Sequence, residues 1–599
     1  MGMSSARLRH RATPVRRLPL AGALRLNRPS DIWFKPALSV VVAVGVPNLT
    51  LLALGRLDLA LYSMAGSLCA LYAHNLPYAA RGRALARVVL GMLVSVAIAL
   101  VTASLTSSAV VLVAVGALLA AAHKAVTDLT RIGPPGPVIF TFISSASLFA
   151  PQTLGQVPGH LALAAAAGAW AWLVGMAPGL VRPHGPERRA TARALNAAAG
   201  YVDAYAAVFP AGERGERGER GERGEASGPG HERARAAAAA AVHAAWQSLL
   251  AAGARPGPRR ALERLVVRAE VALAAPADTD PARLRTWAHD LRGTHPVPRP
   301  EPGRDADELL GVEVELLAAG PAAGKRGKRR WTEGLGPLLP LALRTALGCA
   351  LAGYVSLALG VGRPYWALVT AASLYQANLT LTWSRGVQRV VGNLVGVLLF
   401  AAVAPLAHLG PAALVLCCLA FNFGAEALIT RNYWLGSVCV TPMALLISEF
   451  TGFQEPGGLI TDRVVDTLVG AVVGFVAAVA VTNRRAGDRI EDALDTVERA
   501  REHAARLIAA ERPGSGPGSG PGSGSGSGPG PGPGALEAAR RRLAAALVEL
   551  RATTDAASGE WWQRALPQER VMLAEQAGHR TLAATVRRQG PHVLEDAEA

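Results

Sequence analysis

The sequence predicts an all-α, polytopic membrane protein made of two parallel-repeated six-helix transmembrane blocks with cytoplasmic helical bundles. Apolar residues make up 51% of the 599 residues, and the mean hydropathy is +0.26. A soluble protein of this length is usually less apolar. The apolar residues are also clustered: they form two sets of six stretches, and landmarks of the first set recur in the second.

The clearest landmark is a pair of arginines four residues apart. Arg83 and Arg87 recur as Arg385 and Arg389, an offset of 302 (385 − 83). Each set holds an even number of stretches, so the two halves share one orientation in the membrane and the repeat is parallel. Duplicated blocks of this kind are typical of transporters.

Each apolar stretch is about long enough for a helix to cross ~30 Å of hydrocarbon. The first set is expected at 37–55, 59–78, 84–105, 108–125, 135–150 and 160–181. The second set is expected at 338–360, 364–381, 391–408, 411–429, 432–450 and 464–482.

Charge placement predicts the orientation. Lys and Arg gather in the tail before the first stretch and in the loops after even-numbered stretches, whereas 102–108, 151–159 and 405–410 carry no charge. Because Lys and Arg stay on the cytoplasmic side, both termini and the central segment are expected in the cytoplasm of a plasma (inner) membrane protein. The net charge of +17 is then a topology signal. The sequence does not interleave aromatic and basic residues as a groove for single-stranded nucleic acid does, so nucleic-acid binding is not expected.

The domain organisation follows from composition. A basic cytoplasmic tail (1–36) precedes the first membrane block (37–182), and a charged, Ala-rich helical domain with a Gly-Glu-Arg linker (183–335) follows it. The second membrane block (336–482) leads to another helical domain (483–599), whose Pro/Gly/Ser linker (513–534) is expected to be disordered. Cytoplasmic helices are expected at 188–208, 231–253, 259–275, 281–292, 305–319, 486–511, 535–556 and 565–588.

No catalytic constellation is present. The stretch 322–331 lacks the glycine spacing and Ser/Thr of a phosphate-binding loop, and no HExxH, CxxC or GxSxG motif occurs. His74 and His123 are isolated, and an isolated histidine is more often a structural group than a ligand. We therefore expect no enzyme activity, no cofactor and no metal.

The arginine pairs have two interpretations. A spacing of four puts Arg83 with Arg87, and Arg385 with Arg389, on one helix face at the cytoplasmic entrance. Each pair could hold a carboxylate by charge-assisted, bidentate hydrogen bonds. Alternatively, the arginines only anchor the helices on the cytoplasmic side.

Charges within membrane stretches are costly and mark functional candidates. Glu426, with Asn422 four residues earlier on the same face, is the best one. The alternative is an interfacial pair of Glu426 with Arg431. Lys124 and Asp128 have the same ambiguity in the first block.

Other features of the second block have a structural interpretation. Arg463 and Asp466 are three residues apart and are expected to pair with each other rather than form a gate. The motifs at 392–396 and 470–474 place small residues four apart, which favours close helix packing. Pro47 and Pro442 are either cavity-lining breaks or tolerated kinks.

The stretch 362–396 carries a family resemblance. Its Tyr365-Trp366, its Thr370-Ala371, its Arg385-x-x-x-Arg389 and the glycine-rich span that follows resemble the fusaric acid resistance-like family of integral membrane transporters. The ending at 461–479 is similar to that domain's closing span. The resemblance is strong over about 340–482 and weaker over 37–182, where Tyr62 stands without a Trp and HNLPY replaces QANLT.

The resemblance implies an efflux protein related to aromatic carboxylic acid exporters. The expected function is export of small organic anions, namely aromatic or amphipathic carboxylic acids. Proton exchange is the expected drive, with Glu426 as the carboxylate that carries the proton. A membrane scaffold and a passive anion channel are the alternatives. The expected partners are the lipid bilayer and the anion, with self-association left open. The expected substrate-binding residues are Arg385, Arg389, Thr370, Gln376, Asn422, Glu426, Arg83 and Arg87.

Overall fold

The computed structural model describes most of the chain. The described residues are 20, 22–26, 33–130, 132–133, 135–209, 229–252, 256–274, 276–293, 295–298, 339–481, 486–510, 535–560 and 566–588. Within these ranges every regular element is a helix and no strand occurs. The predicted all-α fold is confirmed. The two low-complexity linkers and the expected helix at 305–319 lie outside the described residues.

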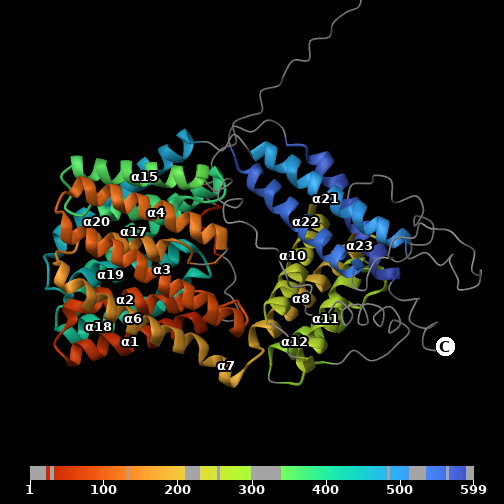
Figure 1. Cartoon of the computed structure of the whole chain (residues 1–599), viewed down its shortest axis with the longest axis horizontal. Helices are drawn as coiled ribbons and strands as arrows, with labels where there is room; N and C mark the ends of the chain where they lie inside the picture. Colours follow the sequence, from red (N-terminus) through yellow and green to blue (C-terminus); the bar gives the residue numbers. More distant parts are fainter. Residues whose placement is uncertain are drawn as a thin grey trace, which may run out of the picture.

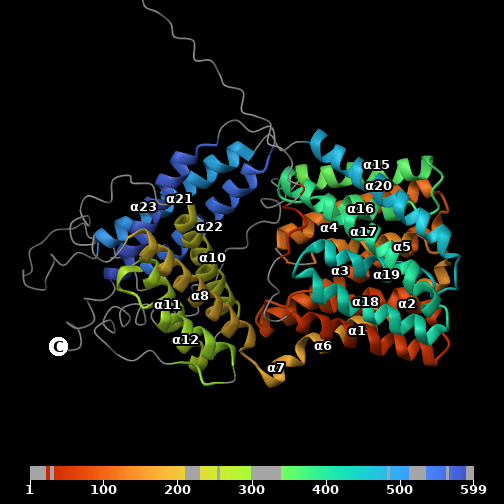
Figure 2. The same cartoon turned by 180° about the vertical axis from the view of Figure 1, so that it is seen from behind.

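The described helices form two groups (Figure 1). The apolar helices lie side by side in one bundle, on the left of the figure, and the charged helices form a second bundle against one end of it. The view from behind shows the same division (Figure 2). The C-terminal ends of α6 and α20 lead toward the charged helices, as the chain order requires.

In the described part of the chain, eight helices are long and apolar enough to cross a membrane. They are α1 (Phe34–Ala53), α3 (Tyr78–Leu105), α4 (Ala109–Thr130), α6 (Val157–Met176), α15 (Leu339–Ala358), α17 (Leu379–Ala407), α18 (Pro411–Ile429) and α20 (Pro456–Ala480). Four apolar segments are shorter: α2 (Ala60–Ser67) with η2 (Leu68–Leu71), α5 (Val138–Leu148), α16 (Tyr365–Leu374) and α19 (Tyr433–Ser448). The expectation of twelve full-length spans is therefore corrected to eight long helices and four short ones.

The short helices are the interior of the apolar bundle. All residues of α16 are buried, whereas long helices expose apolar faces, as Leu398 of α17 does with 71% exposure. A helix that is apolar all round belongs inside a protein. Irregular backbone at membrane depth is tolerated where protein surrounds it, and the break between α16 and α17 is capped by Asn378, whose side chain accepts a hydrogen bond from the amide of Leu381.

Glycines allow the second-block helices to approach closely. A Cβ at Gly392 of α17 would lie 2.5 Å from Ser437 of α19, and one at Gly470 of α20 would lie 2.4 Å from the carbonyl oxygen of Ala367 in α16. Both small-residue motifs thus lie at helix contacts. Pro47 and Pro442 lie inside α1 and α19, which continue through them.

The two blocks place their helices in the same order of lengths: long, short, long, long, short, long. Helices of the two blocks also contact each other: α1 packs on α18, and α15 packs on α4 (Figure 1). The duplication of the six-helix block and the parallel orientation of the two halves stay predictions.

The charged helices have two cores. One joins α8 (Gly185–Val208), α10 (Pro229–Ala251), α11 (Pro256–Ala274) and α12 (Pro281–Arg292), and the other joins α21 (Ala486–Ala510), α22 (Ala535–Ser558) and α23 (Gln568–Arg588). Buried Arg540 of α22 pairs with Glu270 of α11, which also accepts a hydrogen bond from the indole of Trp246. This ion pair links the two cores.

Candidate anion site in the second membrane block

Four helices of the second block, α16, α17, α19 and α20, bring polar side chains together along the interior of the bundle. Helices α17 and α20 are held in register by Asn393, whose amide donates to the hydroxyl of Thr467 at 2.9 Å. The carbonyl oxygen of the Asn393 side chain lies 2.5 Å from the hydroxyl of Thr441 on α19. These contacts mark the middle level of the site.

Two arginines of α17 lie nearer its N-terminal end. The guanidinium of Arg385 lies over the ring of Tyr433, 3.9 Å from its centroid. Arg389 is only 4% exposed, and its Nη1 donates to the hydroxyl of Tyr433 at 3.3 Å. The Nε of Arg389 has no hydrogen-bond partner among the described residues.

A third arginine lies on the other side of Asn393, toward the start of α20. Arg463 is 1% exposed, and its guanidinium lies over Trp366, 5.0 Å from the ring centroid. Its Nε and Nη1 are buried without a hydrogen-bond partner in the described part of the chain. Arg389 and Arg463 are close enough for their positive charges to repel.

The expected pairing of Arg463 with Asp466 is wrong. Asp466 is fully buried at 0% exposure, and its Oδ1 accepts a hydrogen bond of 2.5 Å from the hydroxyl of Ser356 on α15. Its Oδ2 has no partner among the described residues. No ion pair within 4.0 Å joins the two side chains there, because Arg463 extends over Trp366 instead.

This arrangement favours binding of an anion. A buried guanidinium is costly unless its charge is compensated and its N–H groups are bonded. Here Arg389 and Arg463 leave three N–H-bearing nitrogens without partners among the described residues. A carboxylate between them would supply both the charge and the acceptors, and the rings of Trp366 and Tyr433 stack on the guanidinium groups of Arg463 and Arg385 beside it.

Thr370 and Gln376, both expected at the substrate, lie at different levels. Thr370 of α16 is fully buried, and its hydroxyl has no partner among the described residues. Gln376 lies in the break after α16, where its backbone carbonyl accepts from Arg344 at 3.0 Å. Only Thr370 therefore lies in the interior next to the glycine contact of α20.

The first block does not repeat this environment. Arg83 and Arg87 are both exposed on α3, whereas Arg81 is buried and bonds the Nδ1 of His74 at 3.0 Å. The matched arginines therefore face different surroundings, because Arg389 is buried in the second block while Arg83 and Arg87 are exposed in the first.

Asn422 and Glu426 lie apart from this site, on α18. The amide of Asn422 donates to the carbonyl of Cys418 in its own helix at 3.0 Å. Glu426 is half-buried and makes no hydrogen bond or ion pair with any described residue, so the alternative pair with exposed Arg431 does not form.

Lys124 and Asp128, the charged candidates of the first block, pair with each other within α4. Lys124 forms a 2.8 Å ion pair with Asp128 one helical turn away. His123 bonds Ser95 at 2.8 Å and Thr141 at 3.2 Å, which matches its interpretation as a structural group.

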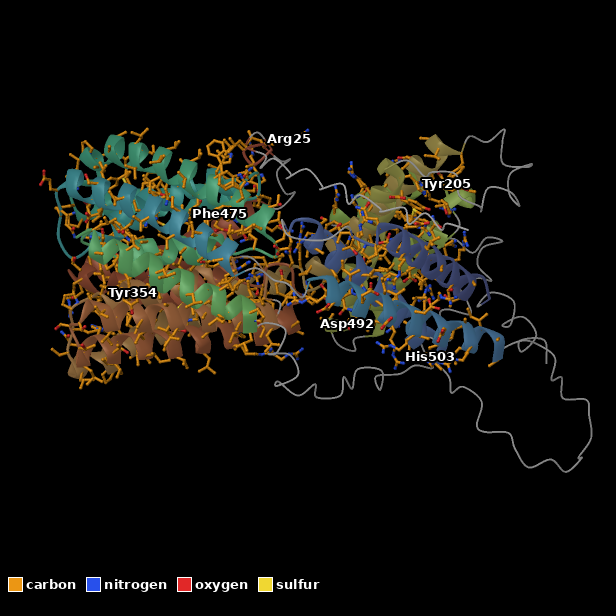
Figure 3. The ribbon with its side chains drawn as sticks, turned by 90° about the horizontal axis from the view of Figure 1, so that it is seen from above. Arg25, Tyr205, Tyr354, Phe475, Asp492 and His503 are labelled. Carbon is orange, nitrogen blue, oxygen red and sulfur yellow. The ribbon has the colours of Figure 1, made fainter. Side chains whose placement is uncertain are left out.

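The N-terminal segment 22–26 covers the end of this site that faces the charged helices. The amide of Asn432 donates to the carbonyls of Ala23 and Arg25, at 3.0 and 2.9 Å. Gln388 and Trp434 donate to the carbonyls of Ala23 and Leu24. Figure 3 shows Arg25 at the end of the apolar bundle that faces the charged helices. The segment therefore lies beside Arg385, Arg389 and Tyr433.

Replacing Asn432 with aspartate should release this segment. An aspartate still accepts the bond from the amide of Trp434 that caps α19, but it cannot donate to the two carbonyls. We expect trypsin to cleave after Arg25 several-fold faster in Asn432→Asp. Asn378→Asp, which alters the cap of α17 in the same way, is the control. Equal cleavage rates in both variants and the wild type would contradict the role of Asn432.

The C-terminal bundle contacts the same end. The backbone amide and hydroxyl of Thr380 donate to the carbonyl of Gly559, just beyond α22, at 3.1 and 2.8 Å. A Cβ on Gly559 would lie 2.3 Å from the side chain of Asn378. Burial raises the pKa of Glu560, and nearby Arg344 opposes this shift. The helix break therefore touches the charged bundle directly.

Two of the site residues could not be found from sequence patterns alone. Arg463 was assigned to a local pair because a spacing of three allows one. Tyr433 carries no signal by itself, since an aromatic residue at the start of an apolar helix is common at membrane interfaces. Only the packing of α19 against α17 brings it to Arg385 and Arg389.

These features define the class: a multi-pass helical membrane protein with buried arginines in its second block. Residues 350–477, which hold most of the site, match the family model described as fusaric acid resistance protein-like. The resemblance seen in the sequence is confirmed over this range.

One curated relative is similar to part of the chain. It is described as uncharacterized membrane protein YvaC of Bacillus subtilis (strain 168), and it is 30% identical over 165 residues. That alignment spans 27% of this chain and 26% of the relative. No solved structure matches the chain.

Proposed function

We propose that the protein is a plasma-membrane secondary exporter of small organic anions, with aromatic or amphipathic carboxylates as substrates and both termini in the cytoplasm. The observation that carries this proposal is buried Arg463, whose Nε and Nη1 lack partners among the described residues while its guanidinium lies over Trp366. The match of residues 350–477 to the fusaric acid resistance protein-like family supports it.

The chemistry of the site favours a planar carboxylate. A guanidinium presents N–H groups in a fixed fork that matches the two oxygens of a carboxylate. Charge-assisted hydrogen bonds of this kind contribute roughly 1.5–3 kcal/mol each. Trp366 and Tyr433 can pack against an aromatic or apolar body of the same ligand.

The contacts also support a route across the bundle. Arg385 and Arg389 lie toward the end where the charged helices contact Thr380, and Arg463 lies beyond the level of Asn393. Basic residues gather at the end with the charged helices, so this end is proposed to be cytoplasmic. An anion would then meet Arg385 and Arg389 first and Arg463 afterwards.

Flux measurements on the purified chain in liposomes test this function. We expect saturable uptake of labelled 4-hydroxybenzoate above that of empty liposomes, and faster uptake when unlabelled substrate fills the lumen. Such acceleration by internal substrate is a property of carriers. Flux without it would favour the passive channel, and no flux above that of empty liposomes would favour the scaffold.

A further inference from the structure

We propose that Asp466 takes up one proton when an organic anion binds at Arg463, so that proton and anion occupy the site together. This inference rests on the proposed function and names the proton-binding group of the same site. The juxtaposition that carries it is a buried carboxylate with a bare oxygen, three residues from a buried guanidinium with bare nitrogens.

Asp466 lies where it would compete with a substrate carboxylate for the charge of Arg463. Asp466 and Arg463 lie on one face of α20, one helical turn apart, and both are almost completely buried. They interact electrostatically without forming an ion pair within 4.0 Å. A substrate carboxylate that reaches the bare nitrogens of Arg463 therefore enters the field of Asp466.

Two carboxylates close together in a buried site repel strongly, and one of them binds a proton to relieve the repulsion. The ionised carboxyl of Asp466, one proton and the substrate anion combine to give the protonated carboxyl beside the bound anion. Arg463 then compensates the substrate alone. The bare Oδ2 is the atom free to receive this proton, because Oδ1 already accepts from Ser356.

The other charged and titratable groups near Asp466 do not replace it in this role. On its own helix Asp462 is one turn nearer the end, and from α16 the phenol of Tyr365 faces both Asp466 and Arg463. From α17 the guanidinium of Arg389 faces Arg463, as does the phenol of Tyr433 from α19. Arg389 is a second permanent cation that attracts the anion. From α15 the neighbour is the neutral hydroxyl of Ser356. Among these, Asp466 is the buried acid next to the guanidinium.

The linkage has a direction. Because the anion favours the protonated carboxyl, a lower pH favours anion binding, and the ionised carboxyl weakens binding at higher pH. Proton and anion therefore move the same way through the site. The exchange expected from the sequence would require the proton to bind as the anion leaves. With this geometry, outward flow follows the concentration gradient of the acid.

Calorimetric titration of the full chain in detergent with benzoate tests the inference. Titrations in two buffers of different ionisation enthalpy, between pH 6 and 8.5, count the protons bound with each anion. For the wild type we expect proton uptake that approaches one per benzoate, and an affinity that falls by up to tenfold per pH unit above the titration of Asp466. Asp466→Asn should bind benzoate at every pH without taking up a proton.

Two further variants keep the test decisive. Glu426→Gln should take up protons like the wild type, because Glu426 lies on α18 away from Arg463. Ser356→Ala retains Asp466 but removes the hydroxyl that bonds its ionised form. The fall in affinity should then begin about one unit higher in pH, and this result decides the matter if Asp466→Asn does not fold.

The possible contradictory results distinguish failure of the proton-binding role of Asp466 from failure of the proposed anion transport. Benzoate binding without proton uptake in the wild type would overturn the role of Asp466 and leave the anion site standing. Unchanged proton uptake in Asp466→Asn, or its loss in Glu426→Gln, would do the same. Absence of benzoate binding in the wild type would overturn both proposals.

Discussion

Replacing Arg463 with glutamine is expected to reduce carboxylate flux at least tenfold. The substitution removes the charge and the bare nitrogens that face the interior, and one charge-assisted hydrogen bond contributes roughly 1.5–3 kcal/mol, which is about tenfold to a hundredfold in affinity. Glutamine is neutral and easier to bury, so the folded yield should not fall. Flux per molecule of folded protein in liposomes is the measurement.

Arg389 allows a finer version of this test. Arg389→Lys keeps the charge but loses the planar fork, so export of an aromatic acid should fall substantially, and it should fall further in Arg389→Gln. Arg87→Gln is the matched control, because Arg87 is exposed on the corresponding helix of the first block. If Arg87→Gln impaired flux as much as Arg389→Gln, the restriction of the site to the second block would be wrong.

Replacing Gly470 with leucine is expected to prevent the second block from packing. A Cβ at this position would lie 2.4 Å from the carbonyl oxygen of Ala367 and 2.8 Å from the Cβ of Thr370. The first obstacle is backbone, which a rotamer change cannot move. Overpacking in protein interiors typically costs about 1–3 kcal/mol, and more where backbones must separate. Thermal unfolding followed by size-exclusion chromatography should show a lower midpoint and little monodisperse protein.

Gly458 is the control for this substitution. It lies on the same helix, and a Cβ there would meet nothing within 4 Å. Gly458→Leu should therefore unfold like the wild type. If Gly470→Leu also unfolded at the wild-type temperature, α16 and α20 would not be in the contact described here.

The sequence allowed the bounds of the helices to be predicted well, but not which apolar helices are short and buried inside the bundle. The charged helices begin and end within three residues of the expected positions, because apolar residues recur at helical spacing. Hydropathy could not separate the short interior helices from full spans, since both are uniformly apolar. The break after Leu374 depends on Asn378 as a helix cap, and asparagine also occurs within membrane helices.

The site was predictable only in part, for a geometric reason. The Arg385 and Arg389 pair could be recognised by its spacing and by its place in the resembling stretch. Its supposed counterpart, Arg83 and Arg87, is exposed on α3 although the spacing is the same. A sequence offset does not report which face of a helix is buried. Likewise, a spacing of three permits a bond between Arg463 and Asp466 but does not require it.

The most direct test of the central claim is to locate a bound carboxylate. Cryo-electron microscopy of the full chain with 4-iodobenzoate, at a concentration that saturates flux, should show the iodinated ligand between the guanidinium groups of Arg389 and Arg463, with its ring near Trp366. A ligand bound near Glu426 or in the first block instead would contradict the account, as would an empty second block at saturation.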